Sequence, residues 1–197
     1  MKEYVIGDAP LGIGDLAAVA REGRRVALGE AARERLAAAR AVVDRVVAEE
    51  RVAYGVTTGF GQLATTHIPV DKVRELQQNL VRSHAVGVGA PLGRDVVRAA
   101  MLIRASTMSK GYSGVRAEIV ELLVGMLNAG VVPYVPSRGS LGASGDLAPS
   151  AHLVLAMMGE GEFLGPYGER TPAPCWRTGT GQHGGVLGHA RREALSP

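Results

Sequence analysis

The residues with the clearest chemical potential in this sequence are the five from Gly142 to Asp146, which read Gly-Ala-Ser-Gly-Asp. Ser144 does not lie in a nucleophile elbow, because that motif needs a glycine two residues after the serine and Asp146 stands there. The stretch also lacks the Gly-Lys-Ser/Thr triplet of a phosphate-binding loop. Taken alone, it is most simply a turn of small residues before a helix.

A third chemistry suits these residue types, namely cyclisation of the backbone. In a compressed loop the amide nitrogen of Gly145 can attack the carbonyl carbon of Ala143. Loss of two water molecules, one of which takes the hydroxyl of Ser144, leaves a five-membered ring with an exocyclic methylene. Glycine at 145 permits the approach because it has no Cβ, and Asp146 could help to move protons. The product, a methylidene-imidazolone, is a strong electrophile that needs no external cofactor.

The elements that must position this loop are mainly helices. Apolar periodicity, helix-stop residues and caps such as Asp15 predict helices over residues 15–22, 30–51, 71–84, 95–109, 115–128 and 149–158. A brief strand is expected over residues 25–28. Residues 131–135 are expected to be extended rather than a central strand, because Pro133 and the following Pro136 cannot donate to a sheet. The sequence therefore predicts a mainly α fold.

Four blocks of the sequence together resemble one known family. Residues 139–152, Gly-Ser-Leu-Gly-Ala-Ser-Gly-Asp-Leu-Ala-Pro-Ser-Ala-His, closely resemble the signature of the aromatic amino-acid ammonia-lyases. Residues 54–61, 80–84 and 110–116 match the same family in the same order and spacing. The resemblance covers about residues 1–172 and is greatest to the histidine ammonia-lyases. It implies the N-terminal domain of their fumarase/aspartase-like helical fold, truncated before the long central helix bundle.

The resemblance also implies roles for individual residues. Ala143, Ser144 and Gly145 would form the methylidene-imidazolone, with Asp146 supporting its formation. In this family the substrate amine, or in an older proposal the aromatic ring, adds to the methylene and ammonia then leaves. Tyr54 matches the tyrosine linked to removal of the β-proton, a role that requires neighbouring groups to favour its phenolate. Without the resemblance, Tyr54 would be interpreted as a loop tyrosine packed on a helix.

His84 matches the family position that contacts the ring of the substrate. A histidine can exchange a hydrogen bond with an imidazole or with a phenol hydroxyl, whereas the ring of phenylalanine offers no partner. The resemblance therefore implies non-oxidative deamination of L-histidine to urocanate and ammonia, with a tyrosine ammonia-lyase or aminomutase as the alternative. Taken alone, His84 would be a helix-end histidine that interacts with the helix dipole. His152, on the helix after the motif, is expected to be structural.

Composition limits the other partners. The 197-residue chain has a net charge of +3 with basic and acidic residues interspersed, so no nucleic-acid surface is predicted. A single cysteine, Cys175, and scattered histidines predict neither a disulfide nor a metal site. Without a signal peptide or an apolar run of membrane-spanning length, a cytoplasmic protein is expected. The resemblance implies a homotetramer.

Residues 173–197 differ in composition from the rest of the chain. The apolar periodicity stops at Pro172, and the segment holds the only cysteine, the only tryptophan and five glycines between Gly179 and Gly188. We expect a non-family tail without stable packing after a domain of residues 1–172. The remaining active-site side chains of the family come from its second half and do not map to this sequence. A catalytically inert fragment is therefore the alternative to an active enzyme.

One hypothesis accounts for the tail together with the length of the chain: the reading frame shifts near residues 172–175. We expect that translation of the coding DNA in one of the other two frames beyond this point restores a family-like sequence. If neither frame does so, the hypothesis is wrong.

Overall fold

The computed structural model describes residues 2–59, 61, 68–165 and 168–172. Its helices are α1 (Ile13–Glu22), α2 (Glu30–Ala48), α3 (Val70–His84), α4 (Arg94–Met108), α5 (Ala117–Asn128) and α6 (Leu147–Met157). Its strands, of three or four residues each, are β1 (Tyr4–Ile6), β2 (Val26–Leu28), β3 (Val88–Pro91), β4 (Pro136–Arg138), β5 (Glu162–Leu164) and β6 (Arg170–Pro172). The predicted mainly α fold is confirmed.

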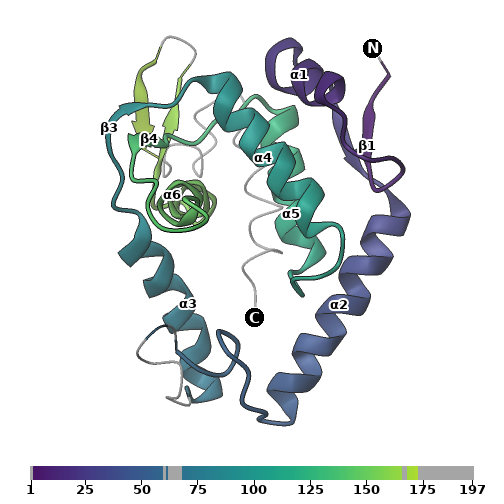
Figure 1. Ribbon diagram of the computed structural model, residues 1–197, viewed down its shortest axis with the longest axis vertical. Helices are drawn as coiled ribbons and strands as arrows, with labels where there is room; N and C mark the ends of the chain where they lie inside the picture. Colours follow the sequence, from purple (N-terminus) through teal and green to yellow (C-terminus); the bar gives the residue numbers. More distant parts are fainter. Residues whose placement is uncertain (1, 60, 62–67, 166–167, 173–197) are drawn as a thin grey trace.

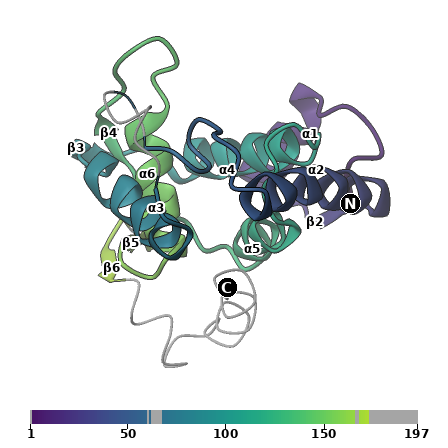
Figure 2. The same ribbon diagram turned by 90° about the horizontal axis from the view of Figure 1, so that it is seen from below.

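The helices form two groups with α4 and α5 in the middle. Figure 1 shows α1 and α2 on one side of this pair and α3 and α6 on the other, and the view from below keeps the same division (Figure 2). Helix α4 packs on α1 and α5, while α3 packs on α6. The buried faces of α4, α5 and α6 belong to one hydrophobic cluster, which includes Met101 of α4, Leu123 of α5 and Leu153 of α6.

The described strands form three two-stranded sheets. Strands β1 and β2 are parallel and are connected through α1, whereas the other two pairs are antiparallel. The pair β3–β4 matters most for the loop of residues 139–146. It places the segment after α3 beside the segment that enters the loop, with Val88 opposite Arg138 and Pro91 opposite Pro136.

Arg98 of α4 is buried and holds the ends of two neighbouring helices. Its guanidinium donates to the carbonyl oxygens of Val19 at 2.7 Å and Ala20 at 3.1 Å on α1, and of Leu127 at 2.9 Å on α5. Burial, and secondarily the charge of Arg94, lowers the pKa of Arg98 below its ordinary value. Since the last carbonyls of a helix have no partner within the helix, Arg98 pairs acceptors that burial would otherwise leave unsatisfied.

The helices begin and end within three residues of the positions that the sequence predicts. The helix expected over residues 30–51 ends at Ala48, and the strand expected over 25–28 is β2. Asp15 does not cap α1, whose N-cap is Gly12. The Asp15 carboxylate instead lies in the first turn, 2.6 Å from a guanidinium nitrogen of Arg24. The predicted cap is wrong because the helix begins earlier, at Ile13, so that Asp15 lies inside its first turn.

We expect Arg98→Met to lower the free energy of unfolding by roughly 2–5 kcal/mol, because several buried carbonyls lose their donor. Urea denaturation followed by circular dichroism measures the change. The control is Arg21→Met, which removes the exposed pair between Arg21 and Asp95 and should cost less than about 1 kcal/mol. Equal losses in the two variants would contradict the role assigned to Arg98.

Candidate active site

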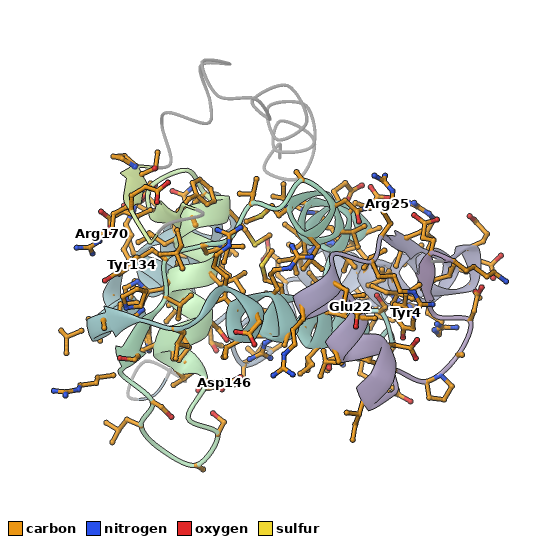
Figure 3. The ribbon with its side chains drawn as sticks, turned by 90° about the horizontal axis from the view of Figure 1, so that it is seen from above. Tyr4, Glu22, Arg25, Tyr134, Asp146 and Arg170 are labelled. Atoms are coloured by element: carbon orange, nitrogen blue, oxygen red, sulfur yellow. The ribbon has the colours of Figure 1, made fainter. Side chains whose placement is uncertain are left out.

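The loop between β4 and α6 extends away from the body of the molecule, with Asp146 at its base (Figure 3). Ala143 and Ser144 are exposed in it, and Gly145 is half-buried. Gly145 has a φ of +68°, and a Cβ on it would lie 2.5 Å from the Oγ of Ser140. Both the backbone conformation and the close approach therefore favour glycine where the cyclisation chemistry needs an unhindered amide.

The C-terminal end of this loop is anchored to α4. Arg104 forms an ion pair with the carboxylate of Asp146 and donates a hydrogen bond of 2.9 Å to the Oγ of Ser150. Asp146 is the N-cap residue of α6, and its carbonyl oxygen accepts the N–H of Ser150 at 2.9 Å. Arg104 was not identified from the sequence, where it lies 42 residues before Asp146 within an ordinary helical pattern.

His84 is the last residue of α3, and the helix determines which of its ring nitrogens carries a proton. Its Nδ1 lies 2.8 Å from the carbonyl oxygen of Leu80 and 3.1 Å from the Oγ of Ser83. Because a carbonyl oxygen can only accept, Nδ1 is the protonated nitrogen, and in the neutral ring Nε2 is an acceptor. The half-buried side chain can therefore accept a hydrogen bond from a donor on a ligand.

The segment that follows His84 is joined to α6. The backbone N–H of Gly87 donates to Nε2 of His152 at 2.9 Å. Burial lowers the pKa of His152, although the negative charge of Glu162 acts in the opposite direction. The imidazole is consequently neutral at neutral pH, as an acceptor must be. Gly139, the first residue of the loop, also reaches this point, since a Cβ on it would lie 3.0 Å from the Cα of Gly87.

Tyr54 begins the turn of residues 54–57, and 65% of its surface is exposed. Its hydroxyl oxygen lies 3.4 Å from the backbone nitrogen of Gly61, from which it accepts a hydrogen bond. Two buried side chains, Thr57 and Thr58, hold the turn through hydrogen bonds to neighbouring backbone groups. The threonines therefore have a structural role in this turn that the sequence did not reveal.

The Tyr54 loop and His84 are attached to different parts of α3. Gln77 donates from its side chain to the carbonyl oxygen of Gly55 at 3.2 Å. Gln77 and His84 are seven residues apart, which is about two helical turns or roughly 10 Å. His84 is therefore connected with the loop of residues 139–146 through Gly87. The Tyr54 loop is instead attached to α3 at Gln77, about two turns before His84.

Within the described residues, no group of three or more His, Cys, Asp or Glu could hold a metal ion. None of the described helices combines the length and the apolar content needed to cross a membrane. An open depression among α1, α4 and α5 is lined by none of the candidate residues. Cys175 and the expected tail lie outside the described residues.

Solved structures of lyases and aminomutases share this architecture. A mutant tyrosine aminomutase with a bound ligand superimposes with a TM-score of 0.84 at 31% identity, covering 91% of this chain and 34% of that one. Histidine ammonia-lyase from Trypanosoma cruzi gives a TM-score of 0.79 at 36% identity, covering 89% of this chain and 34% of that one. The helical fold is thus the one found in ammonia-lyases and amino-acid aminomutases.

Sequence comparison identifies the family. The family model described as aromatic amino acid lyase matches residues 11–181, and this chain belongs to that family. The histidine ammonia-lyase of Caldanaerobacter subterraneus subsp. tengcongensis is 52% identical over 162 residues, which are 82% of this chain and 32% of that protein. The chain therefore spans about a third of the length of the curated relatives that it matches. The matched range ends nine residues beyond the boundary expected at residue 172.

We expect Arg104→Gln to loosen the loop, because Asp146 loses its ion pair. Backbone amides of residues 141–147 should exchange with deuterium roughly three to ten times faster, as measured by mass spectrometry of peptides. Arg40→Gln provides the control, since it removes a similar ion pair with Asp44 on α2. Faster exchange of the loop in both variants, or in neither, would show that Arg104 does not anchor it.

Proposed function

We propose that this chain carries the cofactor-forming part of an enzyme that converts L-histidine to urocanate and ammonia without oxidation. The observation that carries the proposal is the loop after β4, where Gly145, with its φ of +68°, follows the exposed Ala143 and Ser144. Membership of the aromatic amino acid lyase family supports it. So does the identity of about 50% to several proteins named histidine ammonia-lyase.

The electrophile of this proposal is made from the chain itself. The Gly145 nitrogen forms a bond to the carbonyl carbon of Ala143, and the carbonyl oxygen leaves as the first water with the amide hydrogens of Gly145 and Ser144. The Ser144 hydroxyl then leaves as the second water with the hydrogen on its own Cα, which creates the methylene. Asp146 accepts and returns protons next to the ring, while its ion pair with Arg104 keeps the carboxylate beside the loop.

Formation of the ring fits the loop that the structure describes. The chain turns at residues 142–144, which include the Ala143 carbonyl that the Gly145 nitrogen would attack. Gly145 has the positive φ that other residues adopt only with strain. Once formed, the methylene supplies an electrophilic carbon to which the substrate adds, so that ammonia becomes a better leaving group.

His84 would bind the ring of the substrate, and Tyr54 would remove its β-proton. Because the Nε2 of His84 is an acceptor in the neutral ring, it suits a ligand that offers a donor, such as the imidazole N–H of histidine. Tyr54 would remove the β-proton with its phenol oxygen, which already accepts a hydrogen bond from Gly61.

A related activity on tyrosine is the second candidate. A phenol hydroxyl can donate to the Nε2 of His84 as an imidazole N–H does. The likeness to a tyrosine aminomutase at a TM-score of 0.84 favours it, whereas the higher sequence identity to histidine ammonia-lyases favours histidine. We further propose that the chain works in a cytoplasmic homotetramer, as the family resemblance implies.

We expect the intact mass of the purified chain to be lower than that of its sequence by two water molecules, with the loss mapped to the peptide that contains Ala143, Ser144 and Gly145. Ser144→Ala cannot lose the water derived from the hydroxyl, so it should keep more of its mass. The matched control is Ser137→Ala, an exposed serine of β4, which should lose both waters. Addition of histidine should then release urocanate, which absorbs in the ultraviolet, and ammonia.

The outcomes separate the candidates. Release of ammonia from tyrosine but not from histidine would favour the second activity. A modified chain that turns over neither amino acid would indicate that this chain forms the electrophile but lacks other catalytic parts. An unmodified mass would contradict the proposal for this chain and would favour the inert fragment considered from the sequence.

A further inference from the structure

We propose that His152 is a positioning residue for substrate binding, because its hydrogen bond to Gly87 holds the segment that carries His84 against the helix that follows the cofactor-forming loop. The inference rests on the proposed function, in which His84 binds the ring of the substrate. It assigns a role to His152 beyond the structural one that the sequence suggested.

Only a short, hydrogen-bonded stretch of backbone separates His84 from the attachment point. The N–H of Ala85 donates to the carbonyl oxygen of Val81 at 3.1 Å, and the N–H of Val86 donates to that of His84 at 2.9 Å. Gly87 then donates to Nε2 of His152 at 2.9 Å. Because three residues span at most about 10 Å, a displacement of Gly87 must be passed to the end of α3, where His84 lies.

The same point is where three backbone segments meet. A Cβ on Gly87 would lie 3.0 Å from the Nε2 of His152 and 3.2 Å from the carbonyl oxygen of Arg138. A Cβ on Gly139 would lie 3.0 Å from the Cα of Gly87 and 3.3 Å from the Cβ of Ala148. Positions 87 and 139 therefore have no room for a larger side chain. The position of Gly87 sets the distance between the end of α3 and the start of the loop.

The hydrogen bond requires a neutral imidazole on His152. Burial lowers its pKa and Glu162 of β5 opposes this. The other charged groups nearby are directed elsewhere, since Arg82 at the end of α3 pairs with Glu160, and the side chain of Arg138 on β4 lies alongside Gly89. Because the folded-state pKa is below the ordinary 6.5, the bond is present above pH 6.5 and is lost as the pH falls through the lowered value.

His152 acts through Gly87 and the backbone, so its loss should affect binding more than chemistry. His84 would contact the ring of the substrate in the bound complex and in the transition state alike. Weaker contact in both states raises KM and leaves kcat nearly unchanged. A merely structural histidine would instead alter the amount of folded protein and would not produce this separation.

The test uses a set of variants of the whole chain at one pH. Glutamine at position 152 places an acceptor oxygen the same number of bonds from Cβ as Nε2, whereas asparagine places it one bond short and leucine supplies none. His152→Gln should therefore retain the bond, and His152→Asn and His152→Leu should lose it. Gly87→Ala disturbs the contact from the other side. Gly14→Ala is its control, since a Cβ there meets no atom within 4 Å.

We expect the amide of Gly87 to be protected from hydrogen exchange in the wild-type chain and in His152→Gln. Protection should fall about tenfold in His152→Leu, His152→Asn and Gly87→Ala. KM for histidine should rise about five- to tenfold in those three variants, with kcat changed by less than about twofold. Protection in the wild type should also fall on acidification toward pH 5, and in His152→Gln it should not.

Intact mass and turnover, measured on the same samples, distinguish the failure of this inference from that of the proposed function. An unmodified, inactive wild-type chain overturns the proposed function and the positioning role that depends on it. An active wild type whose KM is the same in His152→Leu overturns only the inference. Loss of protection at Gly87 in His152→Gln as large as that in His152→Leu overturns the assigned hydrogen bond itself.

Discussion

The close approach of backbone at Gly87 and Gly139 is the constraint on which the rest of the site depends. With no side chain at either position, the end of α3, the start of the 139–146 loop and helix α6 meet at one point. His152 completes the contact by accepting the N–H of Gly87, a polar group that would otherwise be partly buried without a partner. The distance between His84 and the loop is therefore determined by contacts among backbone atoms and one imidazole ring. Such contacts leave less freedom of position than contacts between flexible side chains.

The loop itself combines two fixed ends with an exposed middle. Gly139 is held against Gly87 at one end, and the ion pair of Arg104 with Asp146 holds the other end on α4. Between them Ala143 and Ser144 are exposed. A chain segment whose ends are fixed has less conformational entropy to lose when its middle is compressed. Anchored ends therefore favour cyclisation, which brings the Gly145 nitrogen to a carbonyl carbon two residues earlier.

The two helical groups contribute differently to this arrangement. Helices α1, α4 and α5 form a rigid base, in which Arg98 satisfies carbonyl oxygens at the ends of two helices. Helix α4 then extends from this base to Arg104, so the loop is anchored to the best-buried part of the molecule. Tyr54 lies on a loop in which Thr57 and Thr58 bind neighbouring backbone groups. Gln77 attaches this loop to α3 about two turns before His84. The chain covers about a third of the length of its relatives, and within it the loop of residues 139–146 and the segment after His84 are joined at Gly87.

Local sequence was sufficient to predict the helices, because each depends on residues close together in the chain, and the order of four short blocks was sufficient to predict the family. The tautomer of His84 is similarly local, since its partner Leu80 lies one turn earlier. Of the six described strands only β2 was predicted, because segments of three or four residues carry little periodicity. The tertiary structure alone decided the roles of Arg104 and His152. Their partners lie 42 and 65 residues away, and nothing in the pattern around a helical arginine or histidine indicates which distant backbone or carboxylate the fold will bring to it.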